Sequence, residues 1–595
     1  MNAPARRYEL DWIRVMAILA VFFFHSTRFF DLWDWHIKNA NNYLWVEIWN
    51  SFMTTWLMPL FFVISGASLF YALSKSGGFK KFYSDKFSRL MVPVVIAACT
   101  HSALQIYLER TFRHVFSGSF FSFYKIYFSG LYFEPNCPGN FAFHGMHLWY
   151  LLFLFLYSLL CYRLFVRLQG SWSNGLKRLT SLLSSPKAMY LILPLPLLLI
   201  KLIVPSSILS VGSGGWGFLY YLWFLIGGFV IASDENLMEC IKRNRNLSLV
   251  LAAAFTAAYL YLVFGALGGA IPYVIRPWVA LLLRFWGAWF WVLAILGQGM
   301  QHLSFNRPIL RHLNEGVLPF YILHQTIILS FGYFVMPLEI ADSVKWLIVF
   351  IDAFALTAGL YYYLIRKLDV LRFLFGMKTS KPLFSKAGKT IVLAALHIVY
   401  AGMIAFSAVN WPAAAAINRA PMPFACDADR DVILDVRNIT EKSPTGVRLV
   451  ADPSASIGRA VELTAGASGK SLPAPEVYVE MQYEAPAGRY TVWLRGKCSV
   501  DDISSDSIWL QSDRWIGTGW GSMLGNWLDI HPAGAWGWAS NGDDPKFIIL
   551  RSDGPHTLRI QPRQIPHRID QIWLSRFQNR IPDSNEPLPE GKSGE

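Results

Sequence analysis

The chain has 595 residues, a length that favours more than one domain, and 54% of them are hydrophobic, including 24 Trp and 44 Phe. That apolar content excludes an ordinary soluble protein. The formal net charge is +14, but the basic excess lies entirely within the apolar residues 1–410, and residues 411–595 carry slightly more acidic than basic side chains. Basic residues interspersed in apolar sequence indicate loops that flank membrane spans, and they argue against a groove for nucleic acid.

Eleven segments are apolar enough, and close enough to the roughly 20 residues required, to cross a bilayer as helices. In chain order they are 10–30, 49–72, 90–108, 147–168, 187–205, 216–232, 247–267, 277–297, 316–336, 344–365 and 390–409. We therefore expect an all-α polytopic membrane core over residues 1–367, followed by an eleventh helix. The first segment contains Asp11 and Arg14 and lacks a convincing cleavage site, so we expect it to stay in the membrane and not to act as a removable signal peptide.

The charges of the loops predict an orientation. When the spans alternate from a cytoplasmic N-terminus, every loop on the cytoplasmic side carries Lys and Arg: 73–89, 167–187, 232–246, 298–315 and 366–389. Most opposite loops are not basic, since 206–215 has no charge and 337–343 carries Glu339 and Asp342, while 109–146 is mixed. The positive-inside rule then places the N-terminus in the cytoplasm and, after an odd number of spans, the C-terminus outside.

The sequence changes character after the last predicted span. Residues 368–389 form a basic cytoplasmic linker before that span, and residues 410–425 form an Ala/Pro linker after it. From residue 426, short alternating runs such as VYVEMQY (478–484) and IDQIWLS (569–575) are separated by turns rich in Gly, Pro and Asp. This pattern predicts an all-β sandwich over 426–580 and a disordered tail over 581–595.

The six cysteines contain no CxxC pair, which argues against a zinc or redox motif, and we expect no metal site. Cys426 and Cys498 both fall in the predicted β domain. An oxidising compartment would permit a disulfide between them, and two buried free thiols are the alternative.

The first span carries one polar stripe. Arg14 and His25 are eleven residues apart, so they differ by only about 20° around a helix and lie about 16 Å apart along it. Asp11 lies one turn before Arg14, and Arg28 lies near one turn after His25. Ionisable groups at such depths normally face a bundle interior or a watery cavity, and Arg284, Asp352 and His324 recur at similar depths. The alternative is an interfacial Asp11–Arg14 ion pair and a core histidine.

At these residues the sequence resembles the acyltransferase 3 family, whose hallmark is an Arg, ten residues and a His in the first helix. Here that stretch reads LDWIRVMAILAVFFFH. Further segments match in order over about residues 7–367: WLMPLFFVISGASLFYAL (56–73), SRLMVPVV (88–95), HLWYLLFLFLY (147–157) and LPFYILHQTIIL (318–329). The opening RxYxLDWIRV and the MPLFFVISGA segment resemble the branch that includes the glucan-modifying succinyltransferases.

The resemblance implies an acyltransferase of a bacterial inner membrane, which moves an acetyl or succinyl group from cytoplasmic acyl-CoA to a hydroxyl of an extracytoplasmic glycan. Acyl-CoA would be a co-substrate, with no bound cofactor. His25 would act as general base, because imidazole titrates near neutral pH, and a covalent acyl-histidine is an alternative. Arg14 and Arg89 would bind the CoA phosphates or the thioester, and Asp11 would hold Arg14 in place.

The other candidates have competing interpretations. Arg307 and Arg311 would bind CoA phosphates or are ordinary loop charges. His324, beside Tyr321, supports the catalytic face together with Arg28 or merely packs there. Trp149 and His147 would stack on the acceptor sugar, with Tyr321 nearby, or belong to an interfacial aromatic belt.

The predicted β domain resembles the jelly-roll modules of galactose-binding-like proteins, through GRYTVWLRG, SIWLQSD, GPHTLRI and IDQIWLS. Exposed Trp faces stack on sugar rings, and a Trp-rich stretch makes the domain a candidate glycan platform. Its members are Trp515, Trp520, Trp527, Trp536 and Trp538. The alternative is that these Trp fill the core or its loops. The domain is expected outside the membrane, in the periplasm, and it shows no second set of catalytic residues.

Two other functions compete with acyl transfer. A transporter would move the acyl donor or glycan without chemistry, but the spans lack the paired broken segments typical of transporters. A sugar-sensing receptor would use the β domain, but the predicted cytoplasmic loops are too short for an output domain. The sequence names neither the acyl group, the acceptor hydroxyl nor the oligomeric state.

Overall fold

The computed structural model describes residues 6–73, 78–135, 137–204, 217–264, 275–427, 430–469, 471–472, 474–498, 507–514, 527–529, 534–541 and 545–589. The chain forms two compact units. The first comprises Met1–Phe29 and Ile48–Trp411, and the second combines Phe30–Glu47 with Pro412–Glu595. A short segment from the start of the chain therefore belongs with the C-terminal part.

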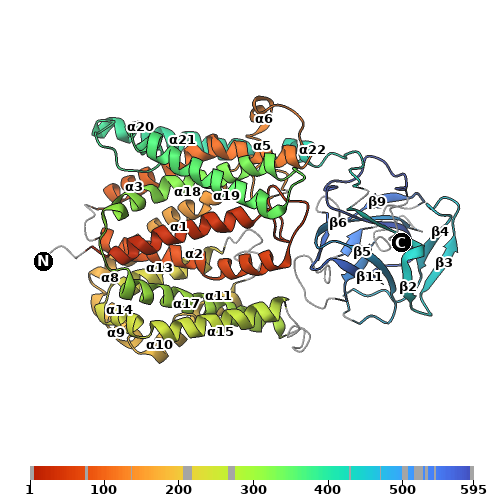
Figure 1. Ribbon diagram of the computed structural model, residues 1–595, viewed down its shortest axis with the longest axis horizontal. Helices are drawn as coiled ribbons and strands as arrows, with labels where there is room; N and C mark the ends of the chain where they lie inside the picture. The colour runs from red at the N-terminus through yellow and green to blue at the C-terminus, as the bar shows by residue number, and fades with distance from the viewer. Residues whose placement is uncertain are drawn as a thin grey trace. The chain divides into compact units, whose positions relative to one another are not determined.

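The first unit is a bundle of helices (Figure 1). Its longer helices are α1 (Tyr8–Thr27), α2 (Leu44–Leu73), α15 (Arg245–Phe264), α17 (Arg276–His302), α18 (Pro308–Val335), α19 (Asp342–Gly359) and α21 (Lys386–Val409). The shorter ones are α3 (Phe79–Lys86), α4 (Val92–Cys99), α5 (His101–Phe112), α6 (Phe120–Ile126), α7 (Trp149–Leu160), α8 (Tyr162–Gln169), α9 (Ser173–Leu183), α10 (Pro186–Ile192), α11 (Leu195–Ile203), α13 (Phe218–Ala232), α14 (Glu235–Arg243), α20 (Asp369–Leu374) and α22 (Trp411–Asn418). Two π-helical turns, η1 (Phe87–Met91) and η3 (Leu360–Ile365), and a 3-10 turn, η2 (Met146–Leu148), connect some of them.

The described chain has eight helices long and apolar enough to cross a membrane, or up to eleven spans if each of three bent pairs counts as one. The bent pairs are Phe79–Cys99 with His101–Phe112, Met146–Leu160 with Tyr162–Gln169, and Phe218–Ala232 with Glu235–Arg243. Either count makes this a multi-pass membrane protein, and the larger one follows the predicted segments in order.

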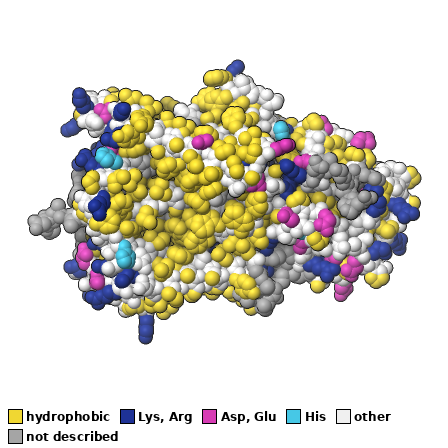
Figure 2. All heavy atoms as spheres, in the orientation of Figure 1, with side chains coloured by type: hydrophobic (Ala, Val, Ile, Leu, Met, Phe, Trp, Pro, Cys, Tyr) yellow, Lys and Arg dark blue, Asp and Glu magenta, His cyan; other side chains and the backbone are white. Residues whose placement is uncertain are grey.

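Surface chemistry divides the bundle along its length. Figure 2 shows hydrophobic side chains covering the visible flank, with Lys and Arg gathered at the end of the bundle where α1 begins. We call this end the Arg14 end and the opposite one the His25 end, after the two residues of α1. The apolar flank suits contact with lipid, because hydrocarbon offers no partner to a charge.

Close helix packing holds α1 and α2 in the middle of the bundle. α1 packs against α17, α18 and α19. α2 crosses α13 at Gly66 and Gly228, where a Cβ would lie 1.9 Å from the Leu225 carbonyl oxygen and 2.0 Å from that of Val63, respectively. Only glycine allows backbones to approach this closely, as is common between membrane helices.

The second unit contains two antiparallel sheets. One has the order β10-β6-β12-β4-β3, with β1 beside β12 and β9 beside β6, and the other has the order β2-β5-β11-β7-β8. The strands are β1 (Val432–Leu434), β2 (Ile439–Lys442), β3 (Val447–Ala451), β4 (Arg459–Leu463), β5 (Val479–Ala485), β6 (Gly488–Cys498), β7 (Ser507–Ser512), β8 (Trp527–Asp529), β9 (Gly537–Ala539), β10 (Phe547–Leu550), β11 (Gly554–Pro562) and β12 (His567–Ser575). A 3-10 turn, η4 (Val436–Asn438), lies between β1 and β2.

One hydrophobic core joins the two sheets. Val492 and Leu494 of β6 pack with Leu558 and Ile560 of β11, and all four are fully buried. The strands alternate apolar residues toward this core, as the short alternating runs of the sequence predict. Cys426 is exposed and Cys498 is buried, and no disulfide joins the two.

The described part of the tail differs from the expectation of disorder. Leu588 is 5% exposed, and its backbone exchanges two hydrogen bonds with the side chain of Gln571 on β12. The backbone carbonyl of Glu586 accepts a hydrogen bond from the indole of Trp538 at 3.0 Å. These buried donors and acceptors need partners, and the polar tail supplies them from its main chain.

The segment 30–47, which follows α1 and includes the first residues of α2, contacts the β domain within the second unit. The Arg489 guanidinium lies 3.5 Å from the Asp34 carboxylate. Arg576 donates a hydrogen bond to the carbonyl of Ala40. Because this segment follows α1 directly, the chain passes from the helix that carries Arg14 and His25 into the second unit.

Candidate active site

Arg14 is held by polar groups from three helices. Its guanidinium lies 3.3 Å from the Asp11 carboxylate and donates to the Asn314 side chain of α18 at 3.2 Å and to the Ser68 hydroxyl of α2 at 3.0 Å. The Arg14 side chain is still 27% exposed, so its charge is positioned but reachable. A fixed, accessible guanidinium is suited to binding phosphate or a polarised carbonyl.

Arg89 lies close enough to Arg14 for the two charges to interact. It is exposed, on the π-helical turn η1, and no carboxylate pairs with it in the part of the chain that the structure describes. Single π-turns are frequent at functional sites. The linker after α20 packs onto this turn: a Cβ at Gly376, whose φ is +68°, would lie 2.3 Å from the Arg89 carbonyl oxygen. The linker therefore helps to shape the surroundings of Arg89.

Three histidines meet at the other end of α1. His25 Nδ1 lies 2.8 Å from His324 Nε2, and the two rings stack with centroids 5.0 Å apart. The ring centroid of His147 is 4.8 Å from that of His324 and 6.1 Å from that of His25. His324 is fully buried and His25 is half-buried.

The hydrogen bonds fix the tautomers of this cluster. His324 Nδ1 lies 2.7 Å from the backbone carbonyl of Tyr321, and a carbonyl oxygen only accepts. His324 therefore carries its proton on Nδ1, and in the neutral ring Nε2 is an acceptor. His25 must then donate from Nδ1, which leaves the lone pair of its neutral ring on Nε2. A partner that sets the tautomer of a histidine in this way is the arrangement used to orient catalytic bases.

His147 and Tyr321 are tied to each other. His147 Nε2 donates to the Tyr321 carbonyl at 2.7 Å, and the Tyr321 hydroxyl donates to the His147 carbonyl. Both side chains are buried, so they join α18 to the start of α7. Trp149 is half-buried and packs on Phe62 and Tyr221, at ring-centroid distances of 6.3 and 5.4 Å. The structure thus gathers His147 and Tyr321 around His324, with Trp149 in a neighbouring aromatic cluster.

Two other predicted residues, Arg28 and Arg307, lie beside aromatic rings. Arg28 follows α1 with its guanidinium 5.8 Å from the Phe24 ring, and Arg307 is exposed before α18 with its guanidinium 5.9 Å from the Phe305 ring. Asp11 pairs with Arg6 at 2.8 Å as well as with Arg14. Over the described residues, no group of three His, Cys, Asp or Glu side chains is arranged to hold a metal ion.

Sequence reasoning did not single out Asn314 and Ser68. Both are polar residues within or beside apolar spans, and the only signal for them was this occurrence at the depth of Arg14. A single sequence does not show which polar residues of separate helices meet. Glu315, also unassigned, pairs with Arg372 of α20 at 2.5 Å and so anchors the basic linker to α18.

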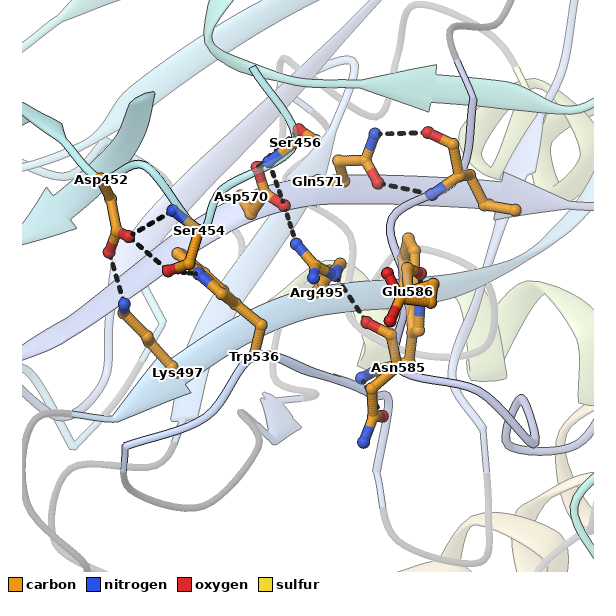
Figure 3. Close-up of polar contacts among 12 residues, drawn as sticks. Asp452, Ser454, Ser456, Arg495, Lys497, Trp536, Asp570, Gln571, Asn585 and Glu586 are labelled. Atoms are coloured by element: carbon orange, nitrogen blue, oxygen red, sulfur yellow. Dashed lines mark hydrogen bonds and ion pairs between the residues drawn. The ribbon is translucent and has the colours of Figure 1, made fainter. Parts of the chain in front are cut away.

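The β domain buries a separate polar network (Figure 3). Arg495 pairs with the buried carboxylate of Asp570, which also accepts from the Ser456 hydroxyl at 2.6 Å. Lys497 pairs with Asp452. Burial acts to raise the pKa of Asp452, but hydrogen bonds from Lys497 and Ser454 outweigh it and hold the pKa well below its ordinary value. The carboxylates of Asp570 and Asp452 each have a cationic partner, as expected of structural ion pairs.

The Trp residues described with their side chains are packed. Trp538 is fully buried in a cluster with Trp493 and Trp573. Trp536 is 7% exposed, donates to the Ser454 hydroxyl at 3.0 Å and covers the ammonium of Lys497 at 4.6 Å. For Trp536 and Trp538 the structure agrees with packing and not with an exposed platform. Trp515, Trp520 and the Trp527 side chain lie outside the described residues.

The family of the chain follows from comparison with known proteins. The model of the acyltransferase 3 family, described as an acyltransferase domain, matches residues 7–366, more than half of the chain. This protein belongs to the acyltransferase 3 family. The match covers the helices from α1 to α19 and includes Arg14, Arg89, His25 and His324.

Similarity to individual proteins is consistent with this family assignment. Glucans biosynthesis protein C from Escherichia coli O139:H28 is 26% identical over 389 residues, covering 63% of this chain and 96% of that protein. The proteins of the same name from E. coli K12 and O157:H7 match over the same shares at the same identity. A solved family GH115 4-O-methyl-α-glucuronidase aligns over 47% of this chain and 32% of its own, with 11% identity and a TM-score of 0.17, and carries no argument.

Proposed function

We propose that this protein is a membrane O-acyltransferase that moves an acetyl or succinyl group from cytoplasmic acyl-CoA to a hydroxyl of an extracytoplasmic glycan, such as a periplasmic glucan or a surface polysaccharide. The observation that carries the proposal is the hydrogen-bond chain from the Tyr321 carbonyl through His324 to His25. It sets the tautomer of a histidine on the same helix stripe as Arg14. The family and the name of the relatives support the same reaction class.

His25 would act as the general base. Its Nε2 takes the proton from the acceptor hydroxyl as the oxygen attacks the thioester carbonyl carbon. The carbon–sulfur bond then breaks, the acyl group stays on the acceptor oxygen as an ester, and the CoA sulfur leaves with the proton returned from Nε2. The Nδ1–H bond to His324 supports the positive charge that His25 carries between these two transfers.

The donor would bind at the Arg14 end. Arg14 and Arg89 together offer guanidinium groups to the CoA phosphates, and the extended pantetheine arm would follow the α1 stripe over the roughly 16 Å to His25. The basic character of this end supports a cytoplasmic location, and the β domain would then lie in the periplasm. Arg307, which is exposed, would add to the general attraction for CoA.

Proteoliposomes containing the full-length protein test this proposal. Radiolabelled acetyl-CoA or succinyl-CoA is supplied on one side and a β-glucan on the other, and label in the glucan is measured. We expect His25→Ala to lower kcat by about a hundredfold or more, because general-base catalysis contributes about that much. Arg14→Ala is expected to abolish transfer at low donor concentration while the protein still inserts.

Matched variants serve as controls. His302→Ala removes an exposed histidine at the end of α17, and Arg243→Ala removes an exposed arginine of α14, and both should leave transfer unchanged. If the glucan crosses or stays unmodified while wild-type protein is intact, the acyltransferase proposal is wrong. Wild-type activity in His25→Ala would refute the role of the α1 stripe.

A further inference from the structure

A second arginine lies within the bundle, on α17. Arg284 is eight residues from the first residue of this helix, or about 12 Å along it. Trp278 and Leu282 are 42% and 37% exposed and mark the outward face of α17. Arg284 is two residues beyond Leu282, about 160° away around the helix, so its side chain points into the bundle.

Three tyrosines lie within electrostatic range of the Arg284 guanidinium. Its electrostatic neighbours are Tyr220 and Tyr221 of α13 and Tyr259 of α15, of which Tyr259 hydrogen-bonds to it. Among the described residues no carboxylate pairs with Arg284. An arginine keeps its charge inside a membrane, and such a charge is costly unless an anion or a watery cavity accompanies it. Neutral phenols supply hydrogen bonds but no counter-charge.

The depth of Arg284 matches that of His25. A Cβ on Gly299 would lie 2.4 Å from the side chain of Ile13, which brings α17 into register with α1. Toward the His25 end, Trp291 packs in the aromatic cluster of α1 and α2, so the two helices run in opposite directions. From that contact His25 lies about 18 Å along α1 and Arg284 about 22 Å along α17. Arg284 is therefore near the acceptor level and far from the donor phosphates.

An aromatic wall connects the two places. Tyr221 packs on Trp149 and Phe62 with centroids 5.4 and 4.9 Å apart. Phe62 packs on Tyr150 at 5.0 Å, and Tyr150 lies 6.0 Å from Tyr321, whose carbonyl holds His324. A continuous chain of aromatic contacts thus connects the histidine cluster with Tyr221, one of the tyrosines near the Arg284 guanidinium.

We propose that Arg284, with Tyr220, Tyr221 and Tyr259, binds an anionic group of the substrate, a carboxylate or a phosphate. One guanidinium and several neutral hydroxyl donors form the donor set that such oxyanions prefer. The inference rests on the proposed acyl transfer, and it restricts the substrates to those that carry a negative charge near the reacting centre. Two sources share this chemistry: the free carboxylate of a dicarboxylic acyl group and an anionic substituent on the acceptor.

Four transfer reactions separate these sources. Succinyl-CoA or acetyl-CoA is combined with either a neutral β-glucan or a phosphorylated β-glucan, and rates are compared for wild type, Arg284→Met and Arg284→Lys. Because Arg284→Met removes a hydrogen-bonded charge, it should lower the transfer rate by about tenfold or more in each reaction whose substrate carries the bound anion. A loss confined to succinyl-CoA identifies the acyl carboxylate, and a loss confined to the phosphorylated glucan identifies the acceptor. Arg284→Lys should retain part of the rate in that same reaction.

Arg276→Met is the matched control, because Arg276 lies on the same helix but donates to the Leu262 carbonyl at 3.0 Å. It should affect all four reactions alike. An equal loss in all four for Arg284→Met, or no loss in any, would overturn the anion site. Binding is read separately, from the melting temperature of the detergent-solubilised protein with inorganic phosphate or monomethyl succinate. Stabilisation that is present in wild type and absent in Arg284→Met supports the site, and identical responses refute it, even if wild type transfers nothing and the proposed function fails.

Discussion

The helix bundle and the β domain both hold charged and polar groups away from water, but they satisfy them differently. In the β domain, buried charges pair with each other: Arg495 with Asp570, and Lys497 with Asp452. In the bundle, the hydrogen-bond chain starts at the Tyr321 carbonyl and passes through the His324 ring to His25.

This difference distinguishes side chains that stabilise the fold from side chains that can take part in a reaction. In a buried ion pair, both side chains already use their charges on each other, so they offer little to a ligand. Breaking such a pair lowers the stability of the fold. A hydrogen-bond chain that fixes one tautomer leaves its last nitrogen with a lone pair, and that nitrogen can exchange a proton with a substrate. Variants of the buried ion pairs should therefore change the stability of the fold, and variants of the histidine chain should change kcat.

The largest expected effect concerns a β-domain pair. Asp570→Ala leaves Arg495 buried without its carboxylate, which should destabilise the domain by about 3–5 kcal/mol. Hydrogen exchange of β6 and β12 in the full-length protein measures the loss. Glu441→Ala, at an exposed pair with Arg514 separated by 3.5 Å, is the control and should cost less than about 1 kcal/mol. Equal effects of the two variants would contradict the contrast between paired burial and exposed charge.

The next effect concerns the bundle. His324→Leu removes the acceptor that holds the Nδ1 proton of His25, and we expect kcat to fall by about tenfold to a hundredfold with KM unchanged. His324→Gln restores an acceptor oxygen and should recover much of the rate, whereas a purely structural role would not distinguish the two substitutions by kcat alone.

His147→Leu serves as the comparison for His324, because His147 hydrogen-bonds to the Tyr321 carbonyl, whereas His324 hydrogen-bonds to His25. It should lower kcat less than His324→Leu does. A rise in KM with an unchanged kcat in His324→Leu would show that the residue binds substrate and does not position the base.

The smallest expected effect is a pH dependence of stability in the β domain. Burial lowers the pKa of His567 to about 3, below its ordinary value of 6.5. The folded state therefore binds this proton less readily than the unfolded state, so the stabilisation is complete above about pH 6.5 and is lost as the pH falls toward 3. From pH 7.5 to 5.5 the loss should be about 1.4 kcal/mol.

His567→Leu should remove this slope, measured as the difference in hydrogen exchange of β12 between the two proteins at each pH. The pKa of His556 is raised because a hydrogen bond to Asp513 outweighs burial. Since both proteins contain His556, its contribution to the pH dependence cancels in this comparison. Identical slopes for wild type and His567→Leu would show that the buried histidine does not contribute.

Hydropathy was sufficient to predict a multi-pass bundle of apolar helices, because an apolar run of span length has few other stable environments. Helical phase was sufficient to place Arg14 and His25 on one stripe of α1. The β strands followed from alternation, since one face of each sheet must be buried.

Contacts between distant segments were not predictable in the same way. Asn314 and Ser68 reach Arg14 from helices far apart in the sequence, and hydropathy does not indicate which polar residues meet. The π-turn at Arg89 has no signal in the composition of the SRLMVPVV stretch. The mutual hydrogen bonds of His147 and Tyr321 depend on how α7 and α18 pack. For Trp536 and Trp538 the sequence left an exposed sugar platform and buried packing as alternatives, because the choice depends on tertiary contacts.

The contact between the α1–α2 segment and the β domain restricts the way the chain is threaded through the bilayer. Asp34 and Ala40 contact Arg489 and Arg576, so both segments lie on the same side of the membrane. The number of crossings between them must then be even. Over the described residues, seven unbroken spans lie in that interval, so an odd number of the three bent pairs must cross, either one or all three. For this part of the chain, parity rules out the count of eight spans and admits the count of eleven.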